Sequence, residues 1–217
     1  ERAARHGRPR RRATLGRERR GDRSGVRELA VKRGPGDWGE ETAFEVRSRD
    51  TDLPLEAYAR LPKFPVHLVL DNLRSAFNVG SIFRTADTAR IASILTCGYT
   101  AHPPHARLEK TALGALDYVH TAHFDSALDA VADLQSRCVS VFALETTSHS
   151  KPYTAVDFPR PVALVLGNEA LGIDREVLAV CDELIEIPVF GYKNSLNVAS
   201  ACAVVLFEIL RRWQVQV

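Results

Sequence analysis

The sequence predicts an α/β domain whose mostly parallel sheet is flanked by helices, preceded by a basic N-terminal arm. After residue 53, short apolar runs rich in β-branched residues alternate with helical stretches, which is typical of a parallel sheet. Residues 1–53, in contrast, hold few large apolar residues and many Arg and Gly. The 217 residues, 45% of them hydrophobic and 26% charged, suit one globular domain. We therefore divide the chain into an arm, residues 1–53, and a folded domain, residues 54–217.

The folded domain is expected to contain six strands and five helices. The apolar runs predict strands at 66–70, 91–96, 118–124, 139–144, 162–166 and 184–187, the third being the weakest. The stretches between them predict helices at 79–89, 108–116, 126–136, 174–181 and 195–213. Asp125, Asp174 and Ser195 are expected to cap the last three helices. Ligands of such sheets bind at the carboxyl ends of the strands, so the loops that follow strands are where a site is expected.

The arm carries the positive charge of the chain. Residues 1–33 hold thirteen Lys or Arg against four acidic residues, whereas residues 34–217 hold sixteen against twenty-three. The arm has too few apolar residues for their burial to offset the entropy cost of ordering the chain. We therefore expect disorder up to about residue 53. Contact with the phosphates of RNA or DNA and a merely solvated tail both remain open. Glu18, Asp22 and Glu28 argue against a third interpretation, an organelle-targeting leader.

The cysteines and the apolar runs bear on the cellular compartment. Cys97, Cys138, Cys181 and Cys202 form no close pair of the redox or metal-binding kind, which favours reduced thiols in an intracellular protein. No apolar run is long enough to span a bilayer. We therefore expect a cytoplasmic protein without a membrane partner. Methionine is absent even at position 1, so we expect the numbering to start inside a longer product or after processing.

Four histidines invite a metal hypothesis. His102, His105, His120 and His123 lie within 22 positions of one another. The two prolines at 103 and 104 prevent a helical ligand spacing, and no cysteine pair supports the site. We therefore expect no metal.

Polar residues mark the loop after the strand at 66–70. Asn78 and Arg84 lie at the start of the helix that follows. A plain interpretation remains open for both, because Asn78 can cap the helix and Arg84 can pair with Asp87 on the same helix.

Two later loops are unusual in the same way. Directly after the strand at 162–166, Gly167 permits a close backbone approach to a ligand. Asn168 and Glu169 follow it and are expected to point into the cleft at the end of the strand. Before the last helix stands Ser195, with Asn197 two positions on. That helix is apolar on nearly every side and should be buried, so its polar first turn is expected to face something specific.

Taken together and in order, these loops resemble the motifs of the SpoU family of RNA ribose 2′-O-methyltransferases, members of the SPOUT class. The resemblance runs from about residue 66 to residue 212. The matching residues are Asn78, Gly80 and Arg84 in the first motif, Gly167, Asn168, Glu169 and Gly172 in the second, and Ile187, Pro188, Gly191, Ser195, Leu196, Asn197 and Val198 in the third.

The resemblance implies a SPOUT-type fold with a C-terminal trefoil knot and S-adenosylmethionine as the cofactor. No G-x-G-x-x-G phosphate cradle follows a strand, which suits a ligand without phosphates. The resemblance also implies a homodimer that acts on tRNA or rRNA. The residues expected to bind the cofactor are Gly167, Ile187, Leu196, Leu166, Asn168, Val189, Leu144 and Glu145.

The reaction that the resemblance implies is methyl transfer to a ribose 2′-hydroxyl, with Arg84 as the central catalytic residue. A guanidinium stays protonated and is a poor base, so Arg84 is expected to stabilise the developing alkoxide and to hold a phosphate. Asn78, Glu169, Ser195 and Asn197 are expected to position the reacting groups. The alternative is a relative of the same fold that binds RNA or cofactor without catalysis. Base methylation belongs to other SPOUT branches with different motifs.

Overall fold

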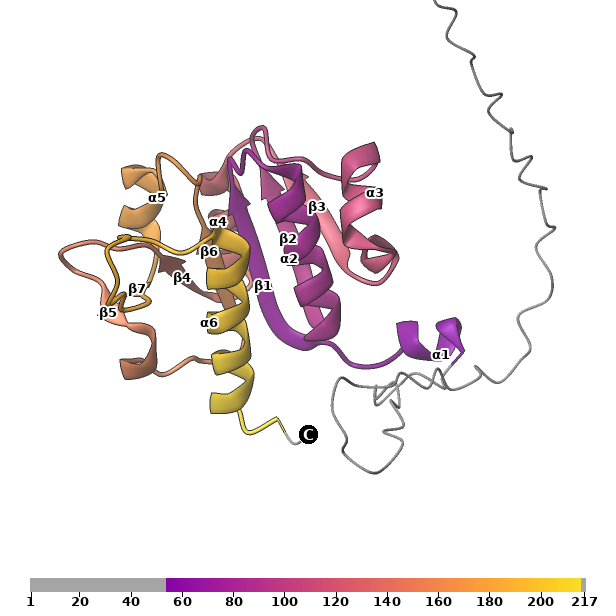
Figure 1. Cartoon of the computed structure of the whole chain (residues 1–217). Helices are drawn as coiled ribbons and strands as arrows, with labels where there is room; N and C mark the ends of the chain where they lie inside the picture. Colours follow the sequence, from indigo (N-terminus) through magenta and orange to yellow (C-terminus); the bar gives the residue numbers. More distant parts are fainter. Residues whose placement is uncertain (1–53, 216–217) are drawn as a thin grey trace, which may run out of the picture. The chain divides into compact units, whose positions relative to one another are not determined.

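A single seven-stranded sheet forms the centre of the folded domain (Figure 1). The structure, a computed structural model, describes residues 54–215, so the predicted arm lies outside the described residues. The strand order is β3-β2-β1-β6-β4-β7-β5 and every pair of neighbours is parallel, which confirms the predicted sheet. The strands are β1 (Phe64–Asp71), β2 (Ile91–Cys97), β3 (His120–Phe124), β4 (Ser140–Leu144), β5 (Lys151–Pro152), β6 (Val162–Leu166) and β7 (Glu183–Glu186).

Helices cover both faces of the sheet. Figure 1 shows α2 (Ala76–Thr88) and α6 (Val198–Arg212) in front of it and α4 (Ala127–Ser136) behind. Two apolar layers result because neighbouring β1 residues point to opposite faces. Leu68 packs in the layer with α2 and α6, whereas Val69 packs in the layer with α4 and α5 (Arg175–Val180). The other helical segments are α1 (Leu55–Ala59), α3 (Ala106–Ala112) and two short 3₁₀ turns, Ala115–Asp117 and Tyr153–Ala155.

Several helix starts differ from the sequence predictions, among them those of α2 and α4. α2 begins at Ala76, earlier than predicted, because Ser75 Oγ accepts the Asn78 backbone N–H at 3.3 Å. Ser75, and not Asn78, is therefore the cap. At α4 the cap is Ser126 rather than Asp125, since Ser126 Oγ accepts the Asp129 N–H at 3.2 Å.

The start of α6 also corrects a prediction. Asn197 Oδ1 accepts the backbone N–H groups of Ala199 and Ser200 at 3.0 and 3.3 Å. Asn197 is thus the cap, and Ser195 lies two residues before this cap. The prediction that Asp174 starts α5 is correct in position, although its side chain accepts no capping hydrogen bond.

Backbone conformation shortens the predicted helix 108–116. Leu113 and Gly114 adopt φ values of 50° and 91°, so α3 stops at Ala112 and a 3₁₀ turn follows.

The close packing of α3 on α2 explains the small residue at position 80. A Cβ atom on Gly80 would lie 1.9 Å from Thr111 Oγ1, so no larger residue fits without moving a helix.

No helix between residues 54 and 215 combines the length and the hydropathy that a membrane crossing requires.

Candidate active site

A cavity of about 700 Å³ lies where the loops after β4, β6 and β7 meet. These are carboxyl-end loops, as expected for a ligand site of a parallel sheet. All eight residues predicted to bind the cofactor line the cavity, and so do four of the five predicted catalytic residues. The lining residues in question are Leu144, Glu145, Leu166, Gly167, Asn168, Ile187, Val189 and Leu196, with Asn78, Glu169, Ser195 and Asn197.

Glu169 fastens the loop after β6 to the start of α2. Its carboxylate accepts the backbone N–H groups of Arg74 and Ser75 at 2.9 and 3.2 Å. It also accepts a hydrogen bond from Asn78 Nδ2 at 2.8 Å. Amide groups before a helix N-terminus favour an anion. Partial burial raises the pKa of Glu169, but the hydrogen bonds from Arg74 and Asn78 outweigh it and hold the pKa below its ordinary value.

Asn78 carries this connection on to the third loop. Its Nδ2 donates to Glu169, while its Oδ1 accepts from Asn197 Nδ2 at 3.1 Å. Asn197 in turn caps α6 through its Oδ1. The Glu169–Asn78–Asn197 chain therefore joins the three motif loops and fixes α2 relative to α6. Ser195 lines the cavity, and its side chain makes no hydrogen bond to the described residues.

Asn168 shapes the loop after β6 from within. Its side chain is 6% exposed, and Oδ1 accepts the N–H groups of Ala170 and Leu171 at 2.8 and 3.0 Å. Nδ2 donates to the Asn72 carbonyl at 2.7 Å and to the Tyr99 hydroxyl at 2.6 Å. The protein thus uses both polar atoms of the side chain, so any cofactor contact of Asn168 is expected from its backbone.

Asn72 and Tyr99, which accept hydrogen bonds from Asn168, were not predicted from the sequence to support the site. Each lies in a loop directly after a strand, which is the one signal that could have found them.

A second carboxylate closes the same loop. Glu145 Oε2 accepts the Ile173 N–H and Oε1 accepts the Thr146 N–H, both at 3.0 Å. Gly172, directly before Ile173, has a φ of 73°, and a Cβ atom on it would lie 2.6 Å from Glu145 Oε2. The loop therefore requires glycine at position 172 for its conformation and for space.

The charge of the cavity is negative. Glu145, Glu169 and Glu186 line it, and the lining residues include no Lys, Arg or His. Backbone N–H groups neutralise part of the charge on Glu145 and Glu169, whereas the Glu186 carboxylate accepts no hydrogen bond from the described residues. Such a cavity favours a cationic ligand over a phosphate-bearing one.

Arg84 is the one predicted catalytic residue that lies outside the cavity. It projects from α2 into solvent, and among residues 54–215 it makes no ion pair. The plain interpretation, a pair with Asp87, is wrong, because Asp87 Oδ1 accepts instead from the Tyr58 hydroxyl at 3.1 Å. Among the residues that the structure describes, Arg84 is therefore available for a partner.

The histidines form a ring contact. His102 and His123 stack with their centroids 4.0 Å apart. In the part of the chain that the structure describes, no three His, Cys, Asp or Glu side chains converge in a way that could hold a metal ion.

A parallel sheet with an acidic ligand cavity at its strand ends defines the general class, an α/β ligand-binding domain. The family follows from comparison: the model of the SpoU rRNA Methylase family matches residues 65–207, and the chain belongs to this family. The family that the sequence motifs resemble is thus the family to which the chain belongs.

Relatives with named activities match the same region. A 23S rRNA (guanosine-2′-O-)-methyltransferase from Xylella fastidiosa is 34% identical over 67% of this chain and 58% of its own length. A tRNA (guanosine(18)-2′-O)-methyltransferase from Thermus thermophilus is 30% identical over 67% of this chain and 74% of its own. The solved structure of an AdoMet-bound rRNA methyltransferase from Sinorhizobium meliloti is 29% identical, with a TM-score of 0.64 over 71% of this chain and 59% of that one. The chain thus spans less than two thirds of several relatives.

Proposed function

We propose that this protein is an S-adenosylmethionine-dependent methyltransferase that acts on a ribose 2′-hydroxyl of tRNA or rRNA. The observation that carries the proposal is the acidic cavity bounded by all three motif loops and tied to α2 by the Glu169–Asn78–Asn197 chain. The activities named for the Xylella and Thermus relatives support the reaction and the class of RNA.

The cavity fits the cofactor in size and chemistry. Its volume of about 700 Å³ lies in the range of small-molecule sites. S-adenosylmethionine bears a sulfonium and an ammonium group, which suit a lining with Glu145 and Glu186. Leu166, Ile187 and Leu196 offer apolar surface for the adenine ring. When bound, the cofactor supplies an electrophilic methyl group.

The chain's own residues must bring the weakly nucleophilic 2′-hydroxyl to reaction. Arg84 would stabilise the developing alkoxide and hold a neighbouring phosphate through its planar guanidinium. Asn78 and Asn197 would hold the loops in register. Ser195, which lines the cavity and has no hydrogen-bond partner among residues 54–215, would contact the ribose or the cofactor.

A homodimer would complete the site. α2 and α6 lie side by side (Figure 1) and leave a partly apolar outer surface, on which Phe77 is 68% and Phe207 48% exposed. Val204 adds to this surface, which in a single copy leaves large apolar side chains in water. Pairing through α2 and α6 would bury them and bring Arg84 toward the partner's cavity, which accounts for its absence from the cavity of its own chain.

Mixing two inactive variants tests the shared site. Arg84→Ala removes the guanidinium, and Leu196→Trp fills the cavity from a half-exposed position. A mixed dimer would retain one complete site, so random mixing should restore about a quarter of the wild-type activity. A mixture as inactive as its components, or a monomer in light scattering, would overturn the shared site.

We infer a trefoil knot in which the segment from β7 through α6 passes through an earlier loop. The sheet order supports it, because β7 joins the sheet beside β4 while α6 returns to pack on α2. The cytoplasmic location stays a prediction.

Calorimetric titration with S-adenosylmethionine tests the cofactor assignment. The wild type should bind it, and Glu186→Gln should bind it more weakly because a carboxylate facing the cationic ligand is lost. No binding to the wild type would contradict the proposal. Binding without methyl transfer to any RNA would establish the alternative, a non-catalytic relative.

A further inference from the structure

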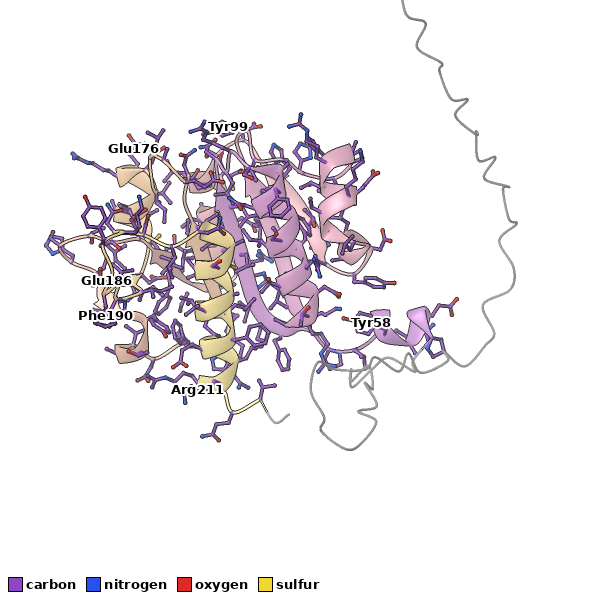
Figure 2. The ribbon with its side chains drawn as sticks, viewed as in Figure 1. Tyr58, Tyr99, Glu176, Glu186, Phe190 and Arg211 are labelled. Atoms are coloured by element: carbon purple, nitrogen blue, oxygen red, sulfur yellow. The ribbon has the colours of Figure 1, made fainter. Side chains whose placement is uncertain are left out.

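One aromatic residue at the edge of the site is both held and exposed. Tyr99, at the upper edge of the molecule in Figure 2, is 60% exposed. Its hydroxyl accepts from Asn168 Nδ2 at 2.6 Å, and its backbone N–H donates to Asn72 Oδ1 at 3.2 Å. Bonds at the backbone and at the hydroxyl restrict the orientation of the ring, while most of the residue is exposed to solvent.

The loop that carries Tyr99 is joined to the loop that carries Arg74. The Leu73 N–H donates to the Oγ1 of the buried Thr100 at 2.9 Å, and Thr100 Oγ1 donates to the Leu70 carbonyl at 3.0 Å. The Arg74 N–H then bonds to Glu169. Arg74 is exposed and makes no ion pair with the residues that the structure describes. The two side chains thus project from neighbouring loops that both bond to the Asn168–Glu169 segment of the cavity.

We propose that Tyr99 and Arg74 form a nucleotide-docking edge of the site, in which the Tyr99 ring stacks on a base and the Arg74 guanidinium contacts a phosphate. This inference rests on the proposed function and adds the elements that hold the RNA next to the cavity. Stacking on an aromatic face tolerates any base, and a guanidinium binds phosphate with two N–H groups. The anchored ring loses little side-chain entropy when it stacks, because its orientation is already fixed.

The salt dependence of RNA binding separates the two contacts. A stacking contact releases no counterions, so Tyr99→Leu should weaken binding of unfractionated tRNA about tenfold at every salt concentration without changing the slope of log K against log salt. Arg74→Ala should lower that slope by about 0.7 to 0.9, the value for one phosphate contact. Tyr99→Phe keeps the ring and should bind tRNA within about twofold of the wild type.

A control and a second ligand complete the test. Arg137→Ala removes an exposed arginine of the α4–β4 turn and should leave the slope unchanged. S-adenosylhomocysteine, titrated by calorimetry, reports on the cavity alone, and its affinity should be equal in Tyr99→Leu and Tyr99→Phe. Wild-type affinity for tRNA in Tyr99→Leu would overturn the docking edge. Equal losses of affinity in Tyr99→Leu and Tyr99→Phe would also overturn it, because they would show that only the hydroxyl matters. A wild type that fails to bind S-adenosylhomocysteine would count against the proposed function itself.

Discussion

Glu169 is the residue on which the geometry of the site depends most. Its two oxygens accept three hydrogen bonds, two from the backbone before α2 and one from Asn78. A side chain expected to act on substrate is thus engaged first in holding loops together. The same holds for Asn168, whose polar atoms are all bonded within the protein. These bonds fix the start of α2 and the wall of the cavity.

Replacing Glu169 by Gln should therefore loosen the fold. The neutral amide keeps an acceptor but loses the charge-assisted bonds, so the free energy of unfolding should fall by about 1 kcal/mol at pH 7. Because hydrogen bonds hold the pKa of Glu169 below its ordinary value, the stabilisation is present above pH 4.5 and is lost as the pH falls through the lowered pKa. Urea unfolding from pH 7 to pH 3 measures both effects. Glu176→Gln on α5 is the control and should change stability by less than about 0.5 kcal/mol; an equal loss in both variants would refute the special role of Glu169.

Arg84 should affect rate and not stability. Because it makes no ion pair within residues 54–215, Arg84→Ala should change the unfolding free energy by less than about 0.5 kcal/mol. The methyl-transfer rate should fall about a hundredfold or more, as for other preorganised charge-stabilising groups. Arg84→Lys should not restore it fully, because an ammonium cannot span hydroxyl and phosphate together. Single-turnover methylation measures the rate, and near wild-type turnover by Arg84→Ala would remove Arg84 from the mechanism.

At the scale of the elements, the sequence predicted which helices and strands exist better than where they begin. The alternation of apolar runs identified β1, β2, β4, β6 and β7, because buried parallel strands are continuous apolar segments. The start of α6 was predicted at Ser195 although Asn197 caps it. Both residue types cap helices, and the choice depends on the bond from Asn197 to Asn78, which lies 119 positions away in the chain. No local pattern contains that information.

β1 carries a titratable group whose burial should make the sheet sensitive to acid. His67 Nδ1 lies 2.7 Å from Ser93 Oγ on β2. Burial, helped by the positive charge of Arg137, lowers the pKa of His67 to about 4. The unfolded chain therefore binds a proton more readily, so stability should be complete above about pH 6.5 and fall as the pH drops from 6.5 toward 4. His67→Gln should flatten this part of the stability curve in urea unfolding. An identical pH dependence in wild type and variant would show that other groups control it.

At the scale of the whole molecule, the charge is divided between the two parts of the chain. The basic residues 1–33 lie outside the described residues, whereas the cavity of the folded domain is acidic. The sequence alone predicted this division and the lining of the cavity. It did not predict that Arg84 lies outside the cavity of its own chain, and only the proposed dimer would give Arg84 a role at such a site.

Deleting residues 1–33 should weaken RNA binding and reduce its salt dependence, because fewer counterions are released when the basic segment is absent. The affinity for S-adenosylmethionine should stay the same. Filter binding of tRNA at several salt concentrations, with calorimetry for the cofactor, measures both. An unchanged salt slope would show that the arm does not contact RNA.

The central claim is that the chain methylates ribose in RNA, and the direct measurement is the chemical identity of the product. The protein is incubated with total RNA and S-adenosylmethionine labelled in its methyl group, and the RNA is then digested to nucleosides and separated. We expect label in a 2′-O-methyl nucleoside with wild-type protein, and at most about a hundredth of it in the same time with Arg84→Ala. Label on a base, or no label in any RNA from a protein that binds the cofactor, would contradict it.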